Sequence, residues 1–202
     1  MDPLTGRWPS KDPIGEGSGA NMYFFLGNDG VNGIDILGLM TEIEAYVAGA
    51  DDAINKTKNS MDQEKGPESR REFCGLICKC KGQYKPTQAH PGSKPALKAI
   101  YNSNTGHVEW IRQNAGSCDP TYNSDTNEPV TCASSLGNDW TAAGAYHSHP
   151  FNSGFSDADK PIVESGYPYA LVTPNGKIII AYPGHFDTPT IIRPARSLLR
   201  TP

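Results

Sequence analysis

The sequence predicts a loop-rich mixed α/β (α+β) domain in which a β-sheet is flanked by helices, and three observations support this class. Thr41 and Glu44 form a Thr-x-x-Glu capping box just before an apolar pattern with helical spacing. Several separated apolar runs have the length of strands, the clearest at 143–149. Residues 174–176 read Pro-Asn-Gly between two such runs, and Asn-Gly in that setting is typical of a β-hairpin. The 21 glycines and 17 prolines predict long loops around the core.

Residues 1–39 differ in composition from the remainder, and we expect tight turns around one aromatic strand there. Asp-Pro and Gly-Asn pairs punctuate this segment, and residues 21–26 read Asn-Met-Tyr-Phe-Phe-Leu. So short a segment buries too little apolar surface to fold alone. The chain therefore divides into a tail over 1–39 and a domain over 40–202.

The domain is predicted to begin with a helix over 41–60, because its apolar residues recur at helical spacing: Ile43, Val47, Ala50 and Ile54. A charged linker over 62–71 follows. Apolar runs predict strands at 73–78, 107–112, 143–149, 169–173 and 177–182. Two long polar stretches, 82–105 and 113–141, are expected to be loops that either border a substrate groove or elaborate the surface.

The composition argues against two classes of partner. The formal net charge is −4 and no basic stripe is present, so nucleic acid is not an expected partner. No apolar run approaches the roughly 20 residues that span a bilayer, and the first residues lack a charged-then-apolar signal. We therefore expect no membrane span and no export signal in this sequence.

The five cysteines leave at least one thiol unpaired if every disulfide is internal. Cys118 and Cys132 bracket a polar loop and are candidates for one disulfide, which spacing alone does not establish. Cys78 and Cys80 are separated by one residue, whereas zinc-binding pairs usually have a gap of two. We interpret that pair as ordinary strand cysteines. The cysteine pattern does not decide whether the protein acts in a reducing or an oxidising compartment.

The most informative motif is His147-Ser-His149, which is followed by Asp159 ten residues after His149. Residues two apart in a strand point to the same face, so both imidazoles are expected to face one spot. Asp159 is the candidate third ligand, with Asp157 in reserve. Three nitrogen or oxygen ligands leave the fourth position of a tetrahedral Zn²⁺ ion open, which favours hydrolysis over a structural role.

A zinc hydrolase also needs a group that takes a proton from water and passes it to the leaving group. Glu72 is the candidate, because it opens the strand at 73–78, where we expect its carboxylate at an edge of the sheet. Ser156 and Asp159 both suit the start of a helix that has Pro161 in its first turn. The other histidines have no matching partners in the sequence and are interpreted as structural: His90, His107 and His185.

The motifs Glu-x-Cys-Gly-Leu-Ile, His-Ser-His-Pro and Phe-Ser-x-x-Asp, spread over about 67–182, resemble the JAMM (JAB/MPN) metallopeptidase signature. The resemblance implies a curved mixed β-sheet flanked by helices. It implies that His147, His149 and Asp159 hold Zn²⁺. It also implies that Glu72 is the general acid/base and that Ser156 stabilises the oxyanion. The step from His149 to Asp159 is one residue shorter than is usual in that family.

Three motifs of the tail, Asp-Pro-x-Gly, Asn-x-Tyr-x-Phe and a closing Asp-x-x-Gly-Leu, resemble the end of the Rhs-associated core domain of Rhs/YD-repeat polymorphic toxins. The resemblance implies that aspartate chemistry cuts the chain between Leu39 and Met40. Asp12 and Asp35 would be the acid pair, since such cleavage needs two carboxyl groups with separated pKa values. Ile36 stands where that family has proline.

Together the two resemblances imply a released toxin that acts as a zinc-dependent peptidase or isopeptidase on a protein or peptide. They imply three further features: the Rhs shell of the same polypeptide as container, a cognate immunity protein, and delivery into a target cell by a specialised secretion system, of which type VI secretion is one candidate. Two alternatives remain, a metal-free JAMM-fold binding module and a metal-dependent nuclease toxin. The zinc content of the protein and the integrity of cellular nucleic acid would separate them.

Overall fold

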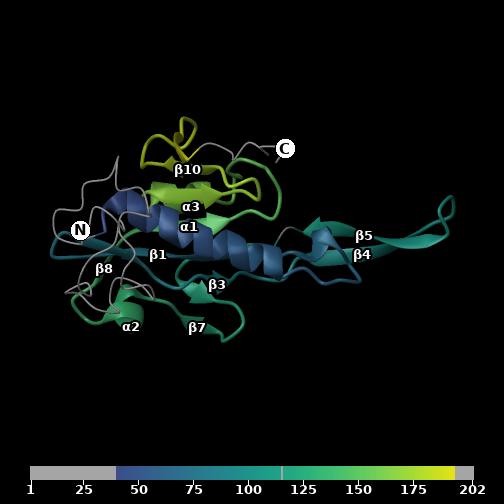
Figure 1. Cartoon of the computed structure of the whole chain (residues 1–202), viewed down its shortest axis with the longest axis horizontal. Helices are drawn as coiled ribbons and strands as arrows, with labels where there is room; N and C mark the ends of the chain where they lie inside the picture. Colours follow the sequence, from purple (N-terminus) through teal and green to yellow (C-terminus); the bar gives the residue numbers. More distant parts are fainter. Residues whose placement is uncertain (1–39, 115, 194–202) are drawn as a thin grey trace, which may run out of the picture.

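A seven-stranded mixed β-sheet forms the centre of the protein in a computed structural model, which describes residues 40–114 and 116–193 (Figure 1). The sheet is curled, loop-rich at its ends and flanked by a few helices, so the predicted mixed α/β class is confirmed. The predicted tail over 1–39 lies outside the described residues, and with it Asp12, Asp35 and Leu39.

The helices are α1 (Glu42–Asn59), a 3₁₀ turn (Pro67–Ser69), α2 (Cys132–Leu136) and α3 (Lys160–Glu164). Within 40–114 and 116–193, no helix has both the length and the apolar character that crossing a membrane requires. The strands are β1 (Phe73–Cys80), β2 (Gln83–Pro86), β3 (His90–Pro91), β4 (Ala96–Asn102), β5 (His107–Asn114), β6 (Tyr122–Asn123), β7 (Glu128–Pro129), β8 (Thr141–Ser148), β9 (Tyr169–Val172), β10 (Ile178–Ala181) and β11 (Thr190–Arg193).

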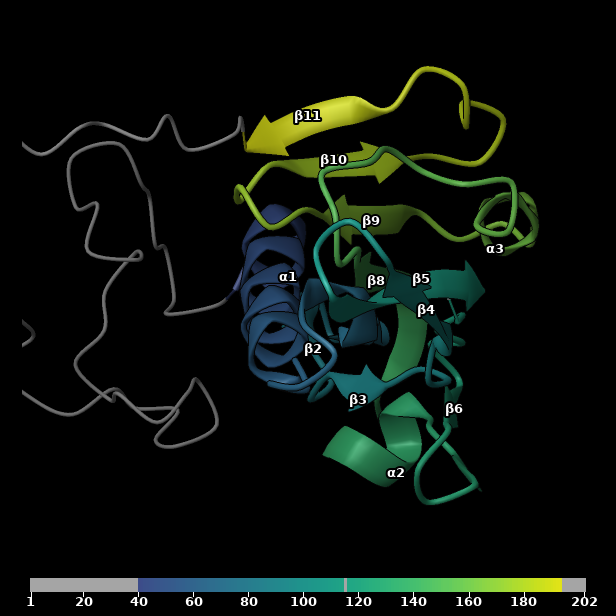
Figure 2. The same cartoon turned by 90° about the vertical axis from the view of Figure 1, so that its right-hand side faces the viewer.

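The central sheet has the strand order β11-β10-β9-β8-β1-β2, and β3 also pairs with β1. Figure 2 shows β11, β10 and β9 side by side in this sheet. The predicted hairpin at 174–176 joins β9 to β10, and Gly176 takes the left-handed conformation with φ of 82°. Strands β8 and β9 are parallel, whereas the other pairs are antiparallel. A parallel pair needs a crossover connection. The crossover over 149–168 carries α3 and leaves directly from the end of the His147 strand.

Helix α1 begins as predicted at the capping box. The Thr41 hydroxyl accepts the backbone N–H of Glu44 at 3.3 Å, and a Glu44 carboxylate oxygen accepts the N–H of Thr41 at 2.7 Å. The predicted apolar face is partly wrong, because Ile43 is 43% exposed. The buried side is built instead from small residues and one tyrosine, which let the helix lie close to the sheet: Ala45, Tyr46, Gly49, Ala50, Ala53, Ile54 and Thr57.

Gly144 in β8 lies under Tyr46 of α1, whose hydroxyl donates to the Pro168 carbonyl oxygen at 3.1 Å. A Cβ atom at position 144 would overlap that hydroxyl. We expect Gly144→Ala to lower the free energy of unfolding by about 1–3 kcal/mol, measured by urea denaturation. Gly154→Ala is the control, since a Cβ there meets nothing within 4 Å. Equal losses of stability in the two variants would contradict this packing.

The two long polar stretches are not simple loops, which corrects the prediction. Residues 82–105 contain β2, β3 and β4, and residues 113–141 contain β6, β7 and α2. Strands β4 and β5 form a hairpin that projects from the body of the protein (Figure 1). Both of its faces meet solvent along much of its length. The strand predicted at 107–112 is β5, whereas β4 lies in the stretch that was predicted to be a loop.

The disulfide predicted between Cys118 and Cys132 is also wrong. Each of these cysteines pairs instead with a cysteine of β1, as Cys74–Cys118 and Cys78–Cys132. Cys74 and Cys78 are four residues apart in one strand and therefore share a sheet face, against which both ends of the 118–132 segment lie. Cys80 is the free cysteine, so the expected unpaired thiol exists. Cys78 is consequently more than an ordinary strand cysteine.

Candidate metal centre

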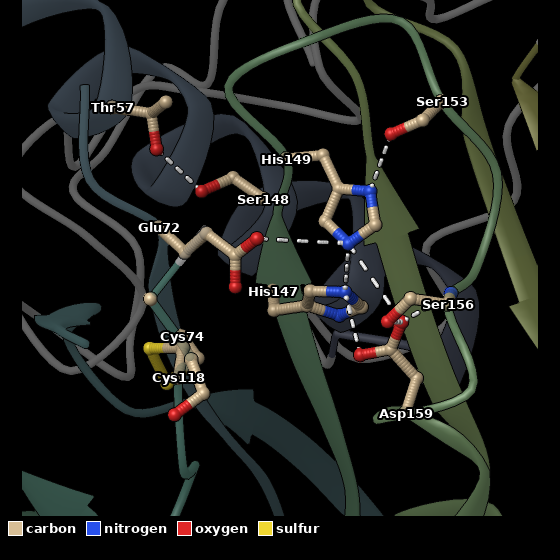
Figure 3. A network of polar contacts seen from close by, with 12 residues as sticks. Thr57, Glu72, Cys74, Cys118, His147, Ser148, His149, Ser153, Ser156 and Asp159 are labelled. Atoms are coloured by element: carbon tan, nitrogen blue, oxygen red, sulfur yellow. Dashed lines mark hydrogen bonds and ion pairs between the residues drawn. A yellow bond between two sulfur atoms is a disulfide. The ribbon is translucent and has the colours of Figure 1, made fainter. Parts of the chain in front are cut away.

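The predicted triad of His147, His149 and Asp159 converges at one buried point (Figure 3). His147 lies near the end of β8, His149 follows that strand, and Asp159 immediately precedes α3 on the crossover. The two histidine Nε2 atoms are 3.1 Å apart. Asp159 Oδ1 lies 3.2 Å from His147 Nε2, and Asp159 Oδ2 lies 3.7 Å from His149 Nε2.

These separations suit a tetrahedral metal ion. Nitrogen and oxygen ligands lie about 2.0–2.1 Å from zinc, so neighbouring ligand atoms in a tetrahedral site are about 3.3 Å apart. The three distances of 3.1, 3.2 and 3.7 Å bracket that value. The triad therefore fits an ion held by two imidazole nitrogens and one carboxylate.

Contacts behind the histidines orient both rings toward this point. His147 Nδ1 lies 3.1 Å from the Ala170 carbonyl oxygen, and His149 Nδ1 lies 2.9 Å from the Ser153 hydroxyl. A carbonyl only accepts, so Nδ1 of His147 carries the hydrogen and its Nε2 keeps the lone pair. Burial lowers the pKa of His147 to about 4, which keeps the ring neutral at pH 7 as a ligand must be.

We expect Ser153→Ala to weaken zinc binding by about 10–100-fold, because groups that orient a ligand histidine contribute that much to affinity. The measurement is a competition titration with a zinc chelator. Ser103→Ala, in the exposed turn between β4 and β5, is the control with the same chemical change. Unchanged affinity in Ser153→Ala would show that His149 is oriented by its packing alone.

Ser156 and Asp159 are joined at the start of α3. The backbone N–H and the hydroxyl of Ser156 donate to Asp159 Oδ2 at 2.7 and 2.8 Å. Burial acts to raise the pKa of Asp159, but His147 and these hydrogen bonds hold the pKa below its usual range. Ser156, predicted as an oxyanion donor, thus orients the ligand carboxylate in this structure. Asp157 is exposed and lies outside the cluster, so the reserve ligand is not used.

Glu72 lies beside the triad, with Oε1 3.8 Å from His149 Nε2 and a side chain that is 12% exposed. It precedes β1, which is an interior strand flanked by β8 and β2, so the expected position at a sheet edge is wrong. Burial raises the pKa of Glu72 to about 7, although nearby His149 and Arg112 act to lower it. A carboxyl group with this pKa is suited to accept and return a proton near neutral pH. A cation bound at the triad would lower the pKa and favour the ionised form, which is the form that accepts a proton.

Besides Ser153, two more residues with hydroxyl groups near the centre were not predicted, Ser148 and Tyr169. The Ser148 hydroxyl, between the two histidines, lies 2.5 Å from the Thr57 hydroxyl of α1 and accepts the Phe73 N–H at 3.0 Å. This contact ties α1, β1 and β8 together at the point where both His149 and Glu72 leave their strands (Figure 3). The alternation of side chains along β8 places Ser148 on the opposite face of the sheet from the histidines. This alternation is the one feature of the sequence from which the position of Ser148 could have been predicted.

Tyr169 is the second unpredicted residue. Its ring stacks on His147 with centroids 4.4 Å apart, and its hydroxyl is buried without a hydrogen-bond partner among the residues that the structure describes. Tyr169 opens β9, and only the parallel register of β8 with β9 brings it beside His147. A register of this kind is not readable from local sequence.

Comparisons with protein-family models, with curated proteins and with solved structures find no match to this chain. The fold and the site alone therefore define its class: a mixed α/β protein with a buried cluster of two histidines and one aspartate that can hold a metal ion. A carboxyl group with a raised pKa stands next to that cluster.

Proposed function

We propose that this protein is a zinc-dependent peptidase or isopeptidase of the JAMM type. The observation that supports this best is the meeting of Glu72, from the start of β1, with the His147, His149 and Asp159 cluster, from the end of β8 and the crossover. Two imidazoles and a carboxylate are a common ligand set of catalytic zinc, which keeps one position open. The fold class is that expected from the JAMM resemblance.

The side chains then have distinct tasks. When bound, zinc would polarise the carbonyl of the scissile bond and lower the pKa of a water molecule. Glu72 takes a proton from the water and returns it to the leaving nitrogen. Ser156 positions Asp159 at rest, and its hydroxyl reaches the oxyanion once it turns away from that carboxylate. Arg112, which acts on the pKa of Glu72, favours the ionised base.

The alternatives make different predictions about metal and substrate. A metal-free binding module predicts purified protein without zinc and activity that is indifferent to chelators. A nuclease predicts damaged nucleic acid in affected cells, and the net charge of −4 does not favour binding to phosphates. The complete ligand set and the adjacent carboxyl group support a metal-dependent hydrolase over the metal-free module.

We further propose that the peptidase is the toxin end of an Rhs polypeptide. The support is the motif pattern of residues 1–39, which lies outside the described residues. In this proposal the Rhs shell holds the domain until a specialised secretion system delivers it into a target cell. A cognate immunity protein would protect the producing cell by covering the metal centre.

Profiling of protein N-termini in cells tests the proposed activity and identifies the substrate. Cells that express the domain are compared with cells that express Glu72→Gln, which keeps the three metal ligands. We expect new N-termini, or lost isopeptide-linked remnants, with the active protein alone. Identical profiles together with equal toxicity of both proteins would contradict the peptidase.

Cleavage of the tail is expected between Leu39 and Met40. Mass spectrometry of the full-length shell protein should find a fragment that begins at Met40. Asp35→Asn should leave the chain whole, because the acid pair is broken. Met40 itself packs against the core, and its carbonyl oxygen accepts the Tyr84 N–H at 3.3 Å. An intact wild-type chain would show that this tail does not cut.

A further inference from the structure

A second cluster of metal-binding residue types adjoins the candidate centre, because Cys74 stands opposite His147 in the pairing of β1 with β8. Cys74 of β1, His90 of β3 and Cys118 are all buried, and one ligand atom from each lies within 4.8 Å of the others. Strand pairing places Cys74 directly opposite His90, and a disulfide joins Cys74 to Cys118. The proposed peptidase mechanism uses none of these three residues.

The ring of His90 has the arrangement expected of a metal ligand. Its Nε2 lies 3.1 Å from the Pro120 carbonyl oxygen. Because a carbonyl only accepts, Nε2 carries the hydrogen and Nδ1 keeps its lone pair. Nδ1 is buried and has no hydrogen-bond partner among the described residues, and His90 as a whole residue is only 5% exposed. A histidine that donates one N–H to a backbone carbonyl and leaves the other nitrogen free is typical of metal sites.

We propose that Cys74, His90 and Cys118 form a second zinc site, which assembles when the Cys74–Cys118 disulfide is reduced. In this reduction an external dithiol gives two electrons and two protons to the Cys74–Cys118 disulfide. The external dithiol becomes a disulfide, and the protein is left with two thiols. Zn²⁺ then replaces the two thiol protons, which pass to solvent, and binds both sulfurs and the free nitrogen of His90. Thiolate and imidazole are ligands that zinc prefers.

The surroundings provide a contrast within the same protein. His90 lines a pocket of about 580 Å³ together with Phe73 and Pro91 among other residues, whereas Cys74 and Cys118 do not line it. The second disulfide, Cys78–Cys132, belongs to no such cluster in the described part of the chain. The inference is independent of the proposed peptidase, since its ligands are different residues.

Cobalt(II) distinguishes the two sites, because sulfur ligands give an intense charge-transfer absorption and the His147, His149 and Asp159 site contains no sulfur. The oxidised domain and the domain reduced with a sulfur-free phosphine are each titrated with Co²⁺. We expect the sulfur absorption only after reduction, with an intensity that corresponds to one sulfur-bound cobalt ion per protein once both sites are filled. His90→Ala in the reduced protein should weaken this binding by more than about tenfold.

Paired variants show which disulfide is responsible. The absorption should persist in Cys78→Ala/Cys132→Ala and disappear in Cys74→Ala/Cys118→Ala. A reduced protein without the absorption would overturn the proposal, as would an absorption that survives loss of Cys74 and Cys118. Circular dichroism accompanies the titration, and reduced protein that stays unfolded in excess Co²⁺ would overturn it as well, since the site needs the paired strands.

Discussion

Replacing Glu72 with glutamine is expected to lower peptidase turnover by about 10²–10⁴-fold, the usual contribution of a general acid/base. Glutamine has the same shape but cannot accept a proton from water. Glu72 is not one of the three clustered ligand residues, so zinc content should stay at the wild-type level. Turnover of a cleaved peptide and metal analysis of the same sample measure both quantities.

Glu128→Gln is the matched control for this variant. Glu128 lies in β7 and is exposed to solvent. The chemical change is the same, and this carboxylate is not part of the clustered ligand set. Full turnover in Glu72→Gln would refute the assigned base, whereas loss of zinc would show that Glu72 is itself a ligand.

The residues of the centre were predictable because each depends on a local pattern. His147 and His149 share a face as a direct result of strand geometry, and Asp159 follows from the start of a helix that Pro161 marks. The meeting of Glu72 with these residues follows from one long-range fact, the antiparallel pairing of β1 with β8, in which Cys74 stands opposite His147. The resemblance to a known motif predicted that Glu72 acts together with the histidines, but the strand pairing itself was not predicted.

The features that were missed depend on register or on irregular segments. Tyr169 reaches His147 through the parallel register of β8 and β9, and Ser153 reaches His149 through an irregular loop. The disulfide prediction failed for the same reason. Cys118 and Cys132 are near each other in sequence, but both lie against β1, which holds two cysteines on one face. Sequence proximity is a weaker guide to disulfides than the strand face that a cysteine occupies.

Removing the Cys78–Cys132 disulfide is expected to lower the free energy of unfolding by about 4 kcal/mol, the loop-closure value for a bridge across this length of chain. The two cysteines are 54 residues apart in sequence, and both are buried against Leu76 and Tyr169. Cys78→Ala/Cys132→Ala keeps the site apolar, so the change isolates the bridge. Guanidinium denaturation of the oxidised proteins, with a chelator present, measures the difference.

Reduction is the internal control for this prediction. Reduced wild-type protein has lost both bridges, and the reduced variant has lost the remaining one, so their stabilities should converge in a chelator. If the oxidised variant is as stable as the oxidised wild type, the bridge does not constrain the unfolded chain. A large difference in stability between the oxidised proteins would mean that the disulfides fix β1, which directly follows Glu72, against the 118–132 segment. The geometry of the candidate metal centre would then depend on the redox state of the compartment in which the protein acts.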